Sequence, residues 1–194
     1  MKNSKLQFVN QLMTSITIVA FFSIITILFS SCSSDDSSST SSPITNPSPT
    51  PMPGTATKAP DFILNSSDGN QVKLSDFSGK VVVIFFFGNS CPSCKAVAPS
   101  IQSKLAAPYA NNSNYQILGL DQWDGNSASV QSFKTVTGVS FPLLLTASSV
   151  ASSYKTTYDR LVVIDKSGNI VFSGKQGASK DVDAVKVKVD ELLK

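Results

Sequence analysis

Two cysteines carry the most obvious chemistry in this 194-residue chain, in the run Gly88-Asn-Ser-Cys91-Pro-Ser-Cys94-Lys95. If a helix begins here, their spacing of three positions places both thiols on one side of its first turn, close enough to form a disulfide. Unpaired N–H groups and the positive dipole end of that helix favour the thiolate form of Cys91. We therefore expect an exposed, nucleophilic Cys91 and a partly covered Cys94 that resolves mixed disulfides.

The residues beside the thiols fit this expectation. Pro92 suits the first position of a helix, because its missing N–H would have no helical partner there. Lys95 adds a cation close to the sulfur atoms. Two other uses of the pair stay open: a structural disulfide, although so short a loop constrains the unfolded chain little, and copper(I) held by two thiolates. Zinc would require four ligands, and we expect neither a metal nor a cofactor.

Composition narrows the chemistry further. The chain has no histidine, which excludes Ser-His-Asp and Cys-His catalytic pairs, His-ligated zinc or haem, and an imidazole general base. It has 16 Lys and Arg against 13 Asp and Glu, a net charge of +3. This near balance argues against electrostatic binding of nucleic acid.

Strands and helices are expected to alternate around the thiols. The run 81–87 is continuously apolar, as is typical of a central strand buried on both faces. Period and turn signals predict the other elements. They are hairpin strands at 62–64 and 71–74, a helix at about 92–107, a strand at 115–121, a helix at 127–137, an extended segment at 141–145, a short helix at 148–154, strands at 161–164 and 170–172, and a final helix capped by Ser179.

This order predicts an α/β fold with a mixed central β-sheet flanked by helices. A β-hairpin opens the domain, and an insert precedes its C-terminal ββα unit. Residues 59–194 are expected to form this single domain. Ligands and chemistry in such sheets gather at the carboxyl ends of the parallel strands, which is where Cys91 falls.

The N-terminus carries the parts of a secretory signal. Lys2 and Lys5 precede the apolar run 16–29, which is followed by Ser30-Ser31-Cys32. The segment resembles a bacterial lipoprotein signal peptide (1–31), which implies that Cys32 is lipidated and starts the mature chain. An uncleaved membrane anchor at 12–29 and cleaved secretion without a lipid are the alternatives. All three place the rest of the chain outside the cytoplasm, on a periplasmic or cell-surface side.

Residues 32–58 are rich in Ser, Thr and Pro and offer little apolar surface to bury. Such a segment cannot offset its ordering entropy, so we expect a tether. Its coil dimension is roughly 25–30 Å. A domain held in this way stays close to the membrane but clear of its surface.

Several segments together resemble the thioredoxin-like oxidoreductases of the TlpA/ResA and redoxin (AhpC/TSA-like) type. They are Ala59-Pro-Asp-Phe62, Leu74-Ser-Asp-Phe-Ser-Gly-Lys80, the apolar strand, the Cys91–Cys94 motif and Pro99. Pro99 matches the proline that kinks the active-site helix of that superfamily. The resemblance implies a thioredoxin-like fold and a thiol-disulfide oxidoreductase with Cys91 and Cys94 as its redox-active centre. It also implies client proteins with disulfides or thiols and a separate electron donor at or near the membrane.

The chain departs from this family beside the cysteines. Ser90 stands where tryptophan usually precedes the first cysteine, and Phe85 replaces the buried acid of cytoplasmic thioredoxins. Asp121 and Asp159 are then the nearest acids to Cys94 by topology. An ordinary solvated aspartate is the expected role of each.

A peroxiredoxin-like thiol peroxidase with antioxidant activity is the main alternative enzyme. Tyr158-Asp159-Arg160 stands where thioredoxins have a cis-proline, whereas peroxiredoxins lack that proline and carry an arginine nearby. Arg160 could therefore support the Cys91 thiolate and orient a peroxide. Against this, Ile84 and Gly88 occupy the proline and threonine positions of the peroxiredoxin motif. Outside enzymes, the alternatives are a copper(I) carrier and an inert scaffold.

Overall fold

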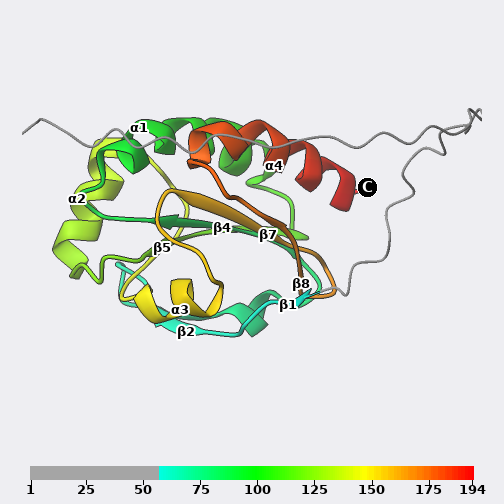
Figure 1. Ribbon diagram of the computed structural model, residues 1–194, viewed down its shortest axis with the longest axis horizontal. Coiled ribbons are helices and arrows are strands. Elements are labelled where there is room, and N and C mark those ends of the chain that lie inside the picture. Colours follow the sequence, from blue (N-terminus) through cyan, green and yellow to red (C-terminus); the bar gives the residue numbers. More distant parts are fainter. Residues whose placement is uncertain (1–56) are drawn as a thin grey trace, which may run out of the picture. The chain divides into compact units, whose positions relative to one another are not determined.

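The computed structural model describes residues 57–194 (Figure 1). The predicted signal peptide, Cys32 and nearly all of the predicted tether lie outside these residues. Thr57 and Lys58, which composition assigns to the tether, form the edge strand β1 (Thr57–Lys58). This strand pairs antiparallel with β8 (Asn169–Ser173), with Lys58 opposite Asn169.

β4 (Val81–Phe87) lies inside a six-stranded sheet, as its unbroken apolar sequence predicts. It pairs in parallel with β5 (Tyr115–Asp121) and antiparallel with β7 (Arg160–Ile164). With β6 (Leu143–Leu144) beside β5, the sheet order is β1-β8-β7-β4-β5-β6. The predicted α/β fold with a mixed central sheet is confirmed, and the strand boundaries at 81–87 and 115–121 are those predicted.

The two faces of β4 bury two separate apolar layers. Val83, Phe85 and Phe87 belong to one layer, together with residues of three helices. Val82, Ile84 and Phe86 belong to the other, beneath a short helix and the N-terminal hairpin. Figure 1 shows α1 and α4 on one side of the sheet and α3 with β2 on the other. This alternation follows from the two-residue period of a strand, which sends successive side chains to opposite faces.

The four α-helices are α1 (Pro92–Ile101), α2 (Ser127–Thr137), α3 (Ser148–Ser153) and α4 (Ala178–Leu192). The predicted boundaries of α2 are confirmed. Along α4, the apolar stripe packs as expected, with Val182, Val185 and Val189 buried and Leu192 partly buried. Within residues 57–194, none of the helices is both long enough and apolar enough to cross a bilayer.

The helix that carries the thiols ends earlier than predicted. It stops at Ile101 and continues as a π-helical turn (Gln102–Ala106) and a 3-10 turn (Ala107–Tyr109). Pro99 lies inside α1, where its ring has no N–H to donate to the carbonyl four residues earlier. The irregular backbone begins within one turn of this proline, a common place for a helix to distort.

The predicted cap of the last helix is wrong. α4 begins at Ala178 with Gly177 as its N-cap residue, so Ser179 lies inside the helix. The Ala178 N–H instead donates to Asp159, both to its carbonyl oxygen (3.0 Å) and to Oδ1 (3.2 Å). A residue far away in the sequence therefore supplies the acceptor that a helix N-terminus needs.

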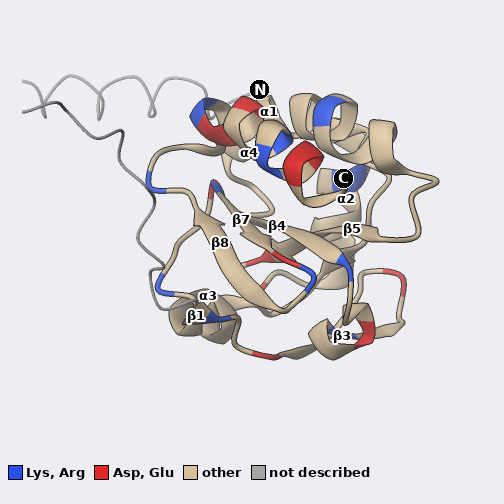
Figure 2. Ribbon diagram, turned by 90° about the vertical axis from the view of Figure 1, so that its right-hand side faces the viewer, with Lys and Arg blue, Asp and Glu red and all other residues tan. Residues whose placement is uncertain are grey.

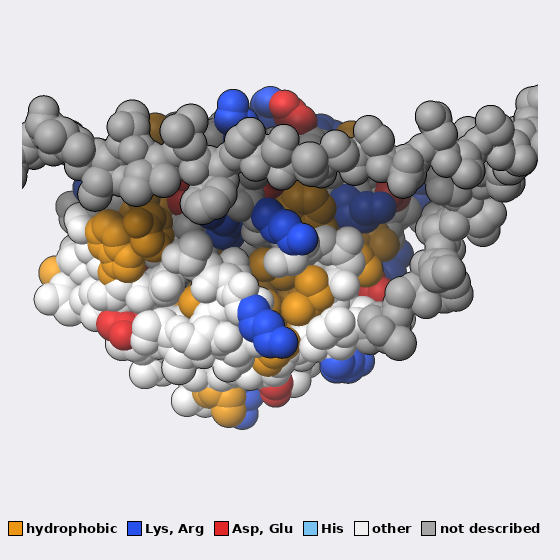
Figure 3. All heavy atoms as spheres, viewed as in Figure 1, with side chains coloured by type: hydrophobic (Ala, Val, Ile, Leu, Met, Phe, Trp, Pro, Cys, Tyr) orange, Lys and Arg blue, Asp and Glu red, His pale blue; other side chains and the backbone are white. Residues whose placement is uncertain are grey.

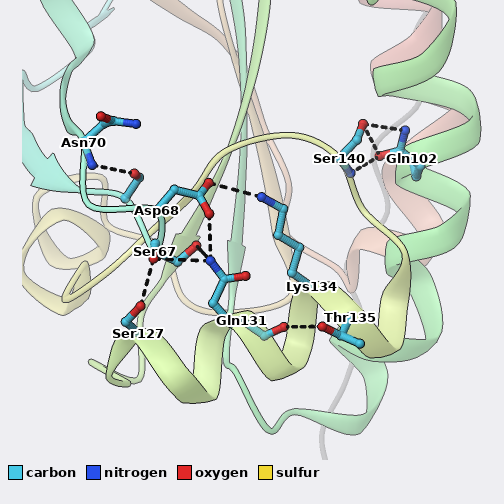
Figure 4. Close-up of polar contacts among 10 residues, drawn as sticks. Ser67, Asp68, Asn70, Gln102, Ser127, Gln131, Lys134, Thr135 and Ser140 are labelled. Atoms are coloured by element: carbon cyan, nitrogen blue, oxygen red, sulfur yellow. Dashed lines mark hydrogen bonds and ion pairs between the residues drawn. The ribbon is translucent and has the colours of Figure 1, made fainter.

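Polar contacts tie the N-terminal hairpin to α2 (Figure 4). The hairpin comprises β2 (Ile63–Asn65) and β3 (Gln71–Lys73), and a 3-10 turn (Leu74–Phe77) follows it. Gln131 Nε2 donates to Asp68 (2.7 Å), and Lys134 forms an ion pair with the same carboxylate (3.2 Å). Both contacts lower the pKa of Asp68, and the hydrogen bond from Gln131 has the larger effect. The hairpin tip is thereby attached to the helix that follows β5.

Candidate active site

Cys91 and Cys94 lie where β4 ends and α1 begins. Cys91 is the N-cap residue of α1, Pro92 is its first residue, and Cys94 lies within its first turn. Both cysteines are free thiols. Lys95 follows on the same helix, half-buried, and its side chain makes no hydrogen bond or ion pair with any described residue. The dithiol therefore occupies the carboxyl end of a parallel strand, where chemistry was expected.

Two groups surround the sulfur of Cys91. Its Sγ accepts a hydrogen bond from the Cys94 N–H (3.2 Å) and lies 3.2 Å from Ser93 Oγ. Both groups can donate to a thiolate, and such charge-assisted bonds add to the effect of the helix N-terminus. The contact of Ser93 with Cys91 was not predicted from the sequence, although Ser93 lies between the two cysteines.

Both thiols are buried, so the expectation of an exposed Cys91 is wrong. Cys91 has 1% of its surface exposed and Cys94 has none. The Cys91 side chain turns back onto the first helical turn to accept its N–H, and it joins the apolar layer that contains Phe87 and Leu161. A reacting sulfur can reach Cys91 only when the surrounding surface opens.

Burial raises the pKa of the Cys94 thiol to about 12. The hydrogen bond with Cys91 and the negative charges of Cys91 and Asp159 act in the same direction, while a hydrogen bond with the backbone of Gly88 opposes them. Cys94 consequently keeps its proton at neutral pH. Cys91, which has two potential hydrogen-bond donors at a helix N-terminus, is therefore the better candidate for the nucleophile.

The reduced protein is expected to lose stability above pH 9. In the unfolded chain Cys94 ionises near the ordinary pKa of 9.0, whereas in the folded protein it holds its proton to about pH 12. The contribution of this pKa difference to the free energy of unfolding is complete below pH 9. It is lost as the pH rises from 9 toward 12, on the order of 1 kcal/mol per pH unit. Urea unfolding of the reduced protein from about pH 7 to pH 11 measures this loss.

Cys94→Ala is the matched control, because it removes this titration and retains Cys91. Buried Tyr115 and Tyr154, whose pKa values burial also raises, titrate equally in both proteins. The free energy of unfolding should therefore fall less steeply with pH in the variant. Equal slopes would show that burial of Cys94 does not control its ionisation.

Asp121 is fully buried, which corrects the expectation of a solvated side chain. Its carboxylate accepts hydrogen bonds from the Asn89 N–H (3.0 Å) and the Asn89 side-chain amide (2.9 Å). It also accepts from the N–H groups of Gly125 (2.7 Å) and Trp123 (3.3 Å). Because four donors already occupy it, Asp121 is a positioning residue that joins the loop before Cys91 to the loop after β5.

Asp159 and Arg160 stand at the entrance to β7. Asp159 is half-buried with a left-handed backbone (φ 56°), and its negative charge helps to raise the pKa of Cys94. Arg160 Nη1 donates to the Asp159 carbonyl oxygen (2.8 Å). Its positive charge also opposes the effect of burial, which raises the pKa of Asp181. No hydrogen bond within residues 57–194 joins Arg160 to either cysteine.

Two aromatic side chains border the site and were missed by motif reasoning. Trp123 packs directly on Gly88, since a Cβ added there would lie 2.5 Å from the indole ring. Tyr158 contacts the same indole edge-on, with ring centroids 5.1 Å apart. The available signals were that Trp123 is the single tryptophan of the chain and that a glycine stands three positions before Cys91.

Within residues 57–194, no three side chains of the types His, Cys, Asp and Glu group together as a metal site would require. The dithiol itself presents two soft sulfur ligands of the kind that copper(I) prefers. Thiol exchange, by contrast, needs only this pair and a helix terminus, both of which the site provides.

Comparison with known proteins adds a family and relatives. The model of the AhpC/TSA family matches residues 55–173. The thiol-disulfide oxidoreductase ResA of Bacillus subtilis is 30% identical over 87 residues, which cover 45% of this chain and 47% of ResA. A protein provisionally named a peroxiredoxin, from Mycobacterium tuberculosis, is 30% identical over 88 residues, which cover 45% of this chain and 54% of that protein. The chain thus matches about half the length of these two relatives.

A solved structure from Bacteroides thetaiotaomicron, provisionally described as a protein disulfide isomerase, is also similar. It is 28% identical, with a TM-score of 0.66, and the match covers 71% of this chain and 89% of that one. A structure from Chlorobium tepidum, provisionally described as the thiol:disulfide interchange protein DsbE, has a TM-score of 0.63 at 23% identity and covers 72% of this chain and 97% of that one. These likenesses show a thioredoxin-like fold.

Proposed function

The chain belongs to the AhpC/TSA family, and from this membership we propose that it is a thiol-disulfide oxidoreductase that exchanges or reduces disulfides in client proteins. One observation carries the proposal. Cys91 Sγ sits at the N-terminus of α1 with two potential donors, three positions before a buried thiol that retains its proton. The similarity to ResA supports the same reaction class.

The cycle begins when the Cys91 thiolate attacks one sulfur of a client disulfide. The client S–S bond breaks, its other sulfur leaves as a thiolate, and Cys91 is joined to the client. Cys94 then loses its proton and attacks Cys91 Sγ, which releases the second client thiolate and forms the Cys91–Cys94 disulfide. Two electrons have passed to the client. An external dithiol reductant must return the pair to its reduced form, and reversal of the cycle oxidises client thiols instead.

Asp159 is the proposed acceptor of the Cys94 proton. Its charge already acts on Cys94, and its left-handed backbone and the hydrogen bonds from Ala178 hold it beside the site. When Cys91 is joined to a client, it carries no negative charge, so one cause of the raised Cys94 pKa disappears. Proton transfer to Asp159 is then easier than in the resting protein.

We further propose that the domain works outside the cytoplasm, attached to a bacterial membrane through lipid on Cys32. This rests on Lys2, Lys5, the apolar run and the small residues before Cys32, which fit a lipoprotein signal. The clients and the electron donor are then proteins of the same compartment.

The second candidate is a thiol peroxidase, which the peroxiredoxin relative and the family itself favour. Two features of the site speak against it. Gly88 offers no hydroxyl group to a peroxide, and the guanidinium of Arg160 is hydrogen-bonded to the Asp159 carbonyl. Copper(I) carriage is the remaining alternative for the dithiol.

Disulfide reduction by the full chain in detergent tests the proposal. With dithiothreitol as the electron source, the protein should release thiols from a peptide disulfide, and Cys91→Ser should lower the rate by about 10³-fold or more. Cys32→Ser is the control, since it removes a cysteine outside the pair together with the proposed lipid, and it should leave the rate in detergent unchanged. Peroxide consumption is expected to stay at background. Peroxide consumption that persists in Cys94→Ser with an added thiol would identify a peroxidase, and stoichiometric copper(I) binding with slow thiol exchange would identify a carrier.

A further inference from the structure

We propose that Trp123 and Tyr158, here called the aromatic pair, form the client-recognition surface and take an apolar side chain next to the client cysteine. The inference rests on the proposed function and adds the kind of client. The occupant is an extended segment of a protein that has not yet folded, because folded proteins bury most of the apolar side chains that flank their cysteines.

The position of the pair follows from the strand order β7-β4-β5. Trp123 comes two residues after β5 ends, and Tyr158 comes two residues before β7 begins. Their loops flank the carboxyl end of β4, and the rings meet beside the Gly88 backbone. A client segment that approaches Cys91 across this end of the sheet comes close to the aromatic pair.

The pair is exposed although it is aromatic. Trp123 has 42% and Tyr158 39% of its surface accessible, whereas Phe85, Phe86, Phe87 and Phe133 are fully buried. Half-exposed tryptophan and tyrosine side chains are the types that most often dominate the binding energy of interfaces. They gain apolar burial without losing much side-chain entropy.

Asp121 ties the backbone of Trp123 to the cysteine loop. Its carboxylate accepts from the Trp123 backbone N–H and from both the backbone and side-chain N–H of Asn89, two residues before Cys91. A cage of hydrogen bonds therefore joins the tryptophan loop to the cysteine loop. A client side chain seated on the indole is held at a defined place relative to Cys91, as positioning of a reacting group requires.

The cysteine loop itself carries no charge, since residues 88–94 include no Asp, Glu, Lys or Arg. Charged residues next to the aromatic pair in sequence are engaged in hydrogen bonds: Asp124 accepts from the Ser148 N–H (3.0 Å), Asp159 accepts from the Ala178 N–H, and Arg160 donates to the Asp159 carbonyl. Figure 2 shows that charges of both signs gather instead along α4. In Figure 3, apolar side chains form a patch at the end of the sheet where α2 and the start of α1 lie. The surface therefore favours apolar over charged client segments.

Two peptides test this recognition. They are identical except that leucine or serine flanks a single cysteine, which is carried as a mixed disulfide with 2-mercaptoethanol. The full chain with Cys94→Ser in detergent stops at the mixed disulfide, so its rate constant reports attack by Cys91. The leucine peptide should react about tenfold faster than the serine peptide. Adding Trp123→Ser and Tyr158→Ser should reduce this ratio to less than about twofold.

Hydroxyethyl disulfide, which has no apolar side chain, reports any general change in the reactivity of Cys91, so each variant's peptide rates are divided by its rate with this disulfide. Val187→Ser, at an exposed valine on α4, should leave the peptide ratio unchanged, and Trp123→Phe should retain part of it. A preference that is absent in the parent, or retained without the aromatic pair, overturns the inference and leaves the oxidoreductase standing. If no disulfide reacts with Cys91, the proposed function fails and the inference fails with it.

Fluorescence gives a second readout on the unaltered side chains. Trp123 is the single tryptophan of the chain, so its emission reports contact with a bound client directly. The mixed disulfide with the leucine peptide should shift this emission toward shorter wavelength, because the client side chain excludes water from the indole. Equal spectra with the leucine and serine peptides would contradict seating on Trp123, whatever the stability of the variants.

Discussion

Cys94→Ser is expected to arrest the reaction after its first step and leave Cys91 joined to client proteins by a lasting disulfide. A serine hydroxyl cannot attack the mixed disulfide, so release by the second thiol stops while attack by the first continues. Among the described residues, no other cysteine lies in the site to replace Cys94. Turnover of a peptide disulfide should fall by about 10³-fold or more.

The measurement is gel electrophoresis without reductant, after the variant has been exposed to proteins from the compartment in which it is proposed to work. Adducts should be abundant, should disappear with dithiothreitol, and should be absent from the Cys91→Ser, Cys94→Ser double variant. That double variant is matched in every residue except the nucleophile. Complete absence of adducts dependent on Cys91 would contradict the oxidoreductase proposal.

Asp121→Ala is expected to cause a large loss of stability, because Asp121 is a buried polar residue with four hydrogen-bond donors. The variant removes an acceptor from four N–H donors and leaves a space at a fully buried position. Each buried donor left unpaired costs about 1–3 kcal/mol, so with four donors the free energy of unfolding should fall by about 4 kcal/mol or more. A fall in melting temperature of about 10 °C or more should accompany it.

Thermal unfolding followed by circular dichroism checks this prediction. Asp183→Ala is a suitable control, because Asp183 is exposed and only forms a surface ion pair with Lys104. It should change the free energy of unfolding by less than about 1 kcal/mol. The rate of attack by Cys91 should also fall in Asp121→Ala below the melting temperature, as the cysteine loop loses its anchor. An unchanged melting temperature together with an unchanged rate would remove Asp121 from the positioning role.

Much of the fold could be predicted because its signals are local. The strand at 81–87 has no polar residue to interrupt it, and the helix at 127–137 has both a regular apolar spacing and Gly138 in the left-handed conformation after it. The distortion after Pro99 could not be placed in this way. It depends on how the end of α1 packs, as well as on the missing N–H.

In the site, too, the features that depend on neighbouring residues could be predicted and those that depend on distant residues could not. The spacing of Cys91 and Cys94 sufficed to place them at a helix N-terminus, because that arrangement depends on neighbouring residues. Burial of Cys91, the four donors around Asp121 and the cap that Asp159 gives to α4 could not be predicted, since each depends on loops that meet only in the folded chain. Long-range acceptors of this kind leave no short sequence motif.

The pairing of β1 with β8 determines at which end of the sheet the chain enters the domain. Lys58 lies opposite Asn169, next to the turn that follows β7, and Ile164 at the end of β7 pairs with Val82 at the start of β4. The chain therefore enters the domain at the pole of the sheet opposite Cys91, with the length of β4, about 20 Å, between them. If the chain is attached through lipid on Cys32, as proposed, the attachment acts on the pole of the domain opposite the dithiol, and Cys91 and Cys94 lie at the far end of β4 from it.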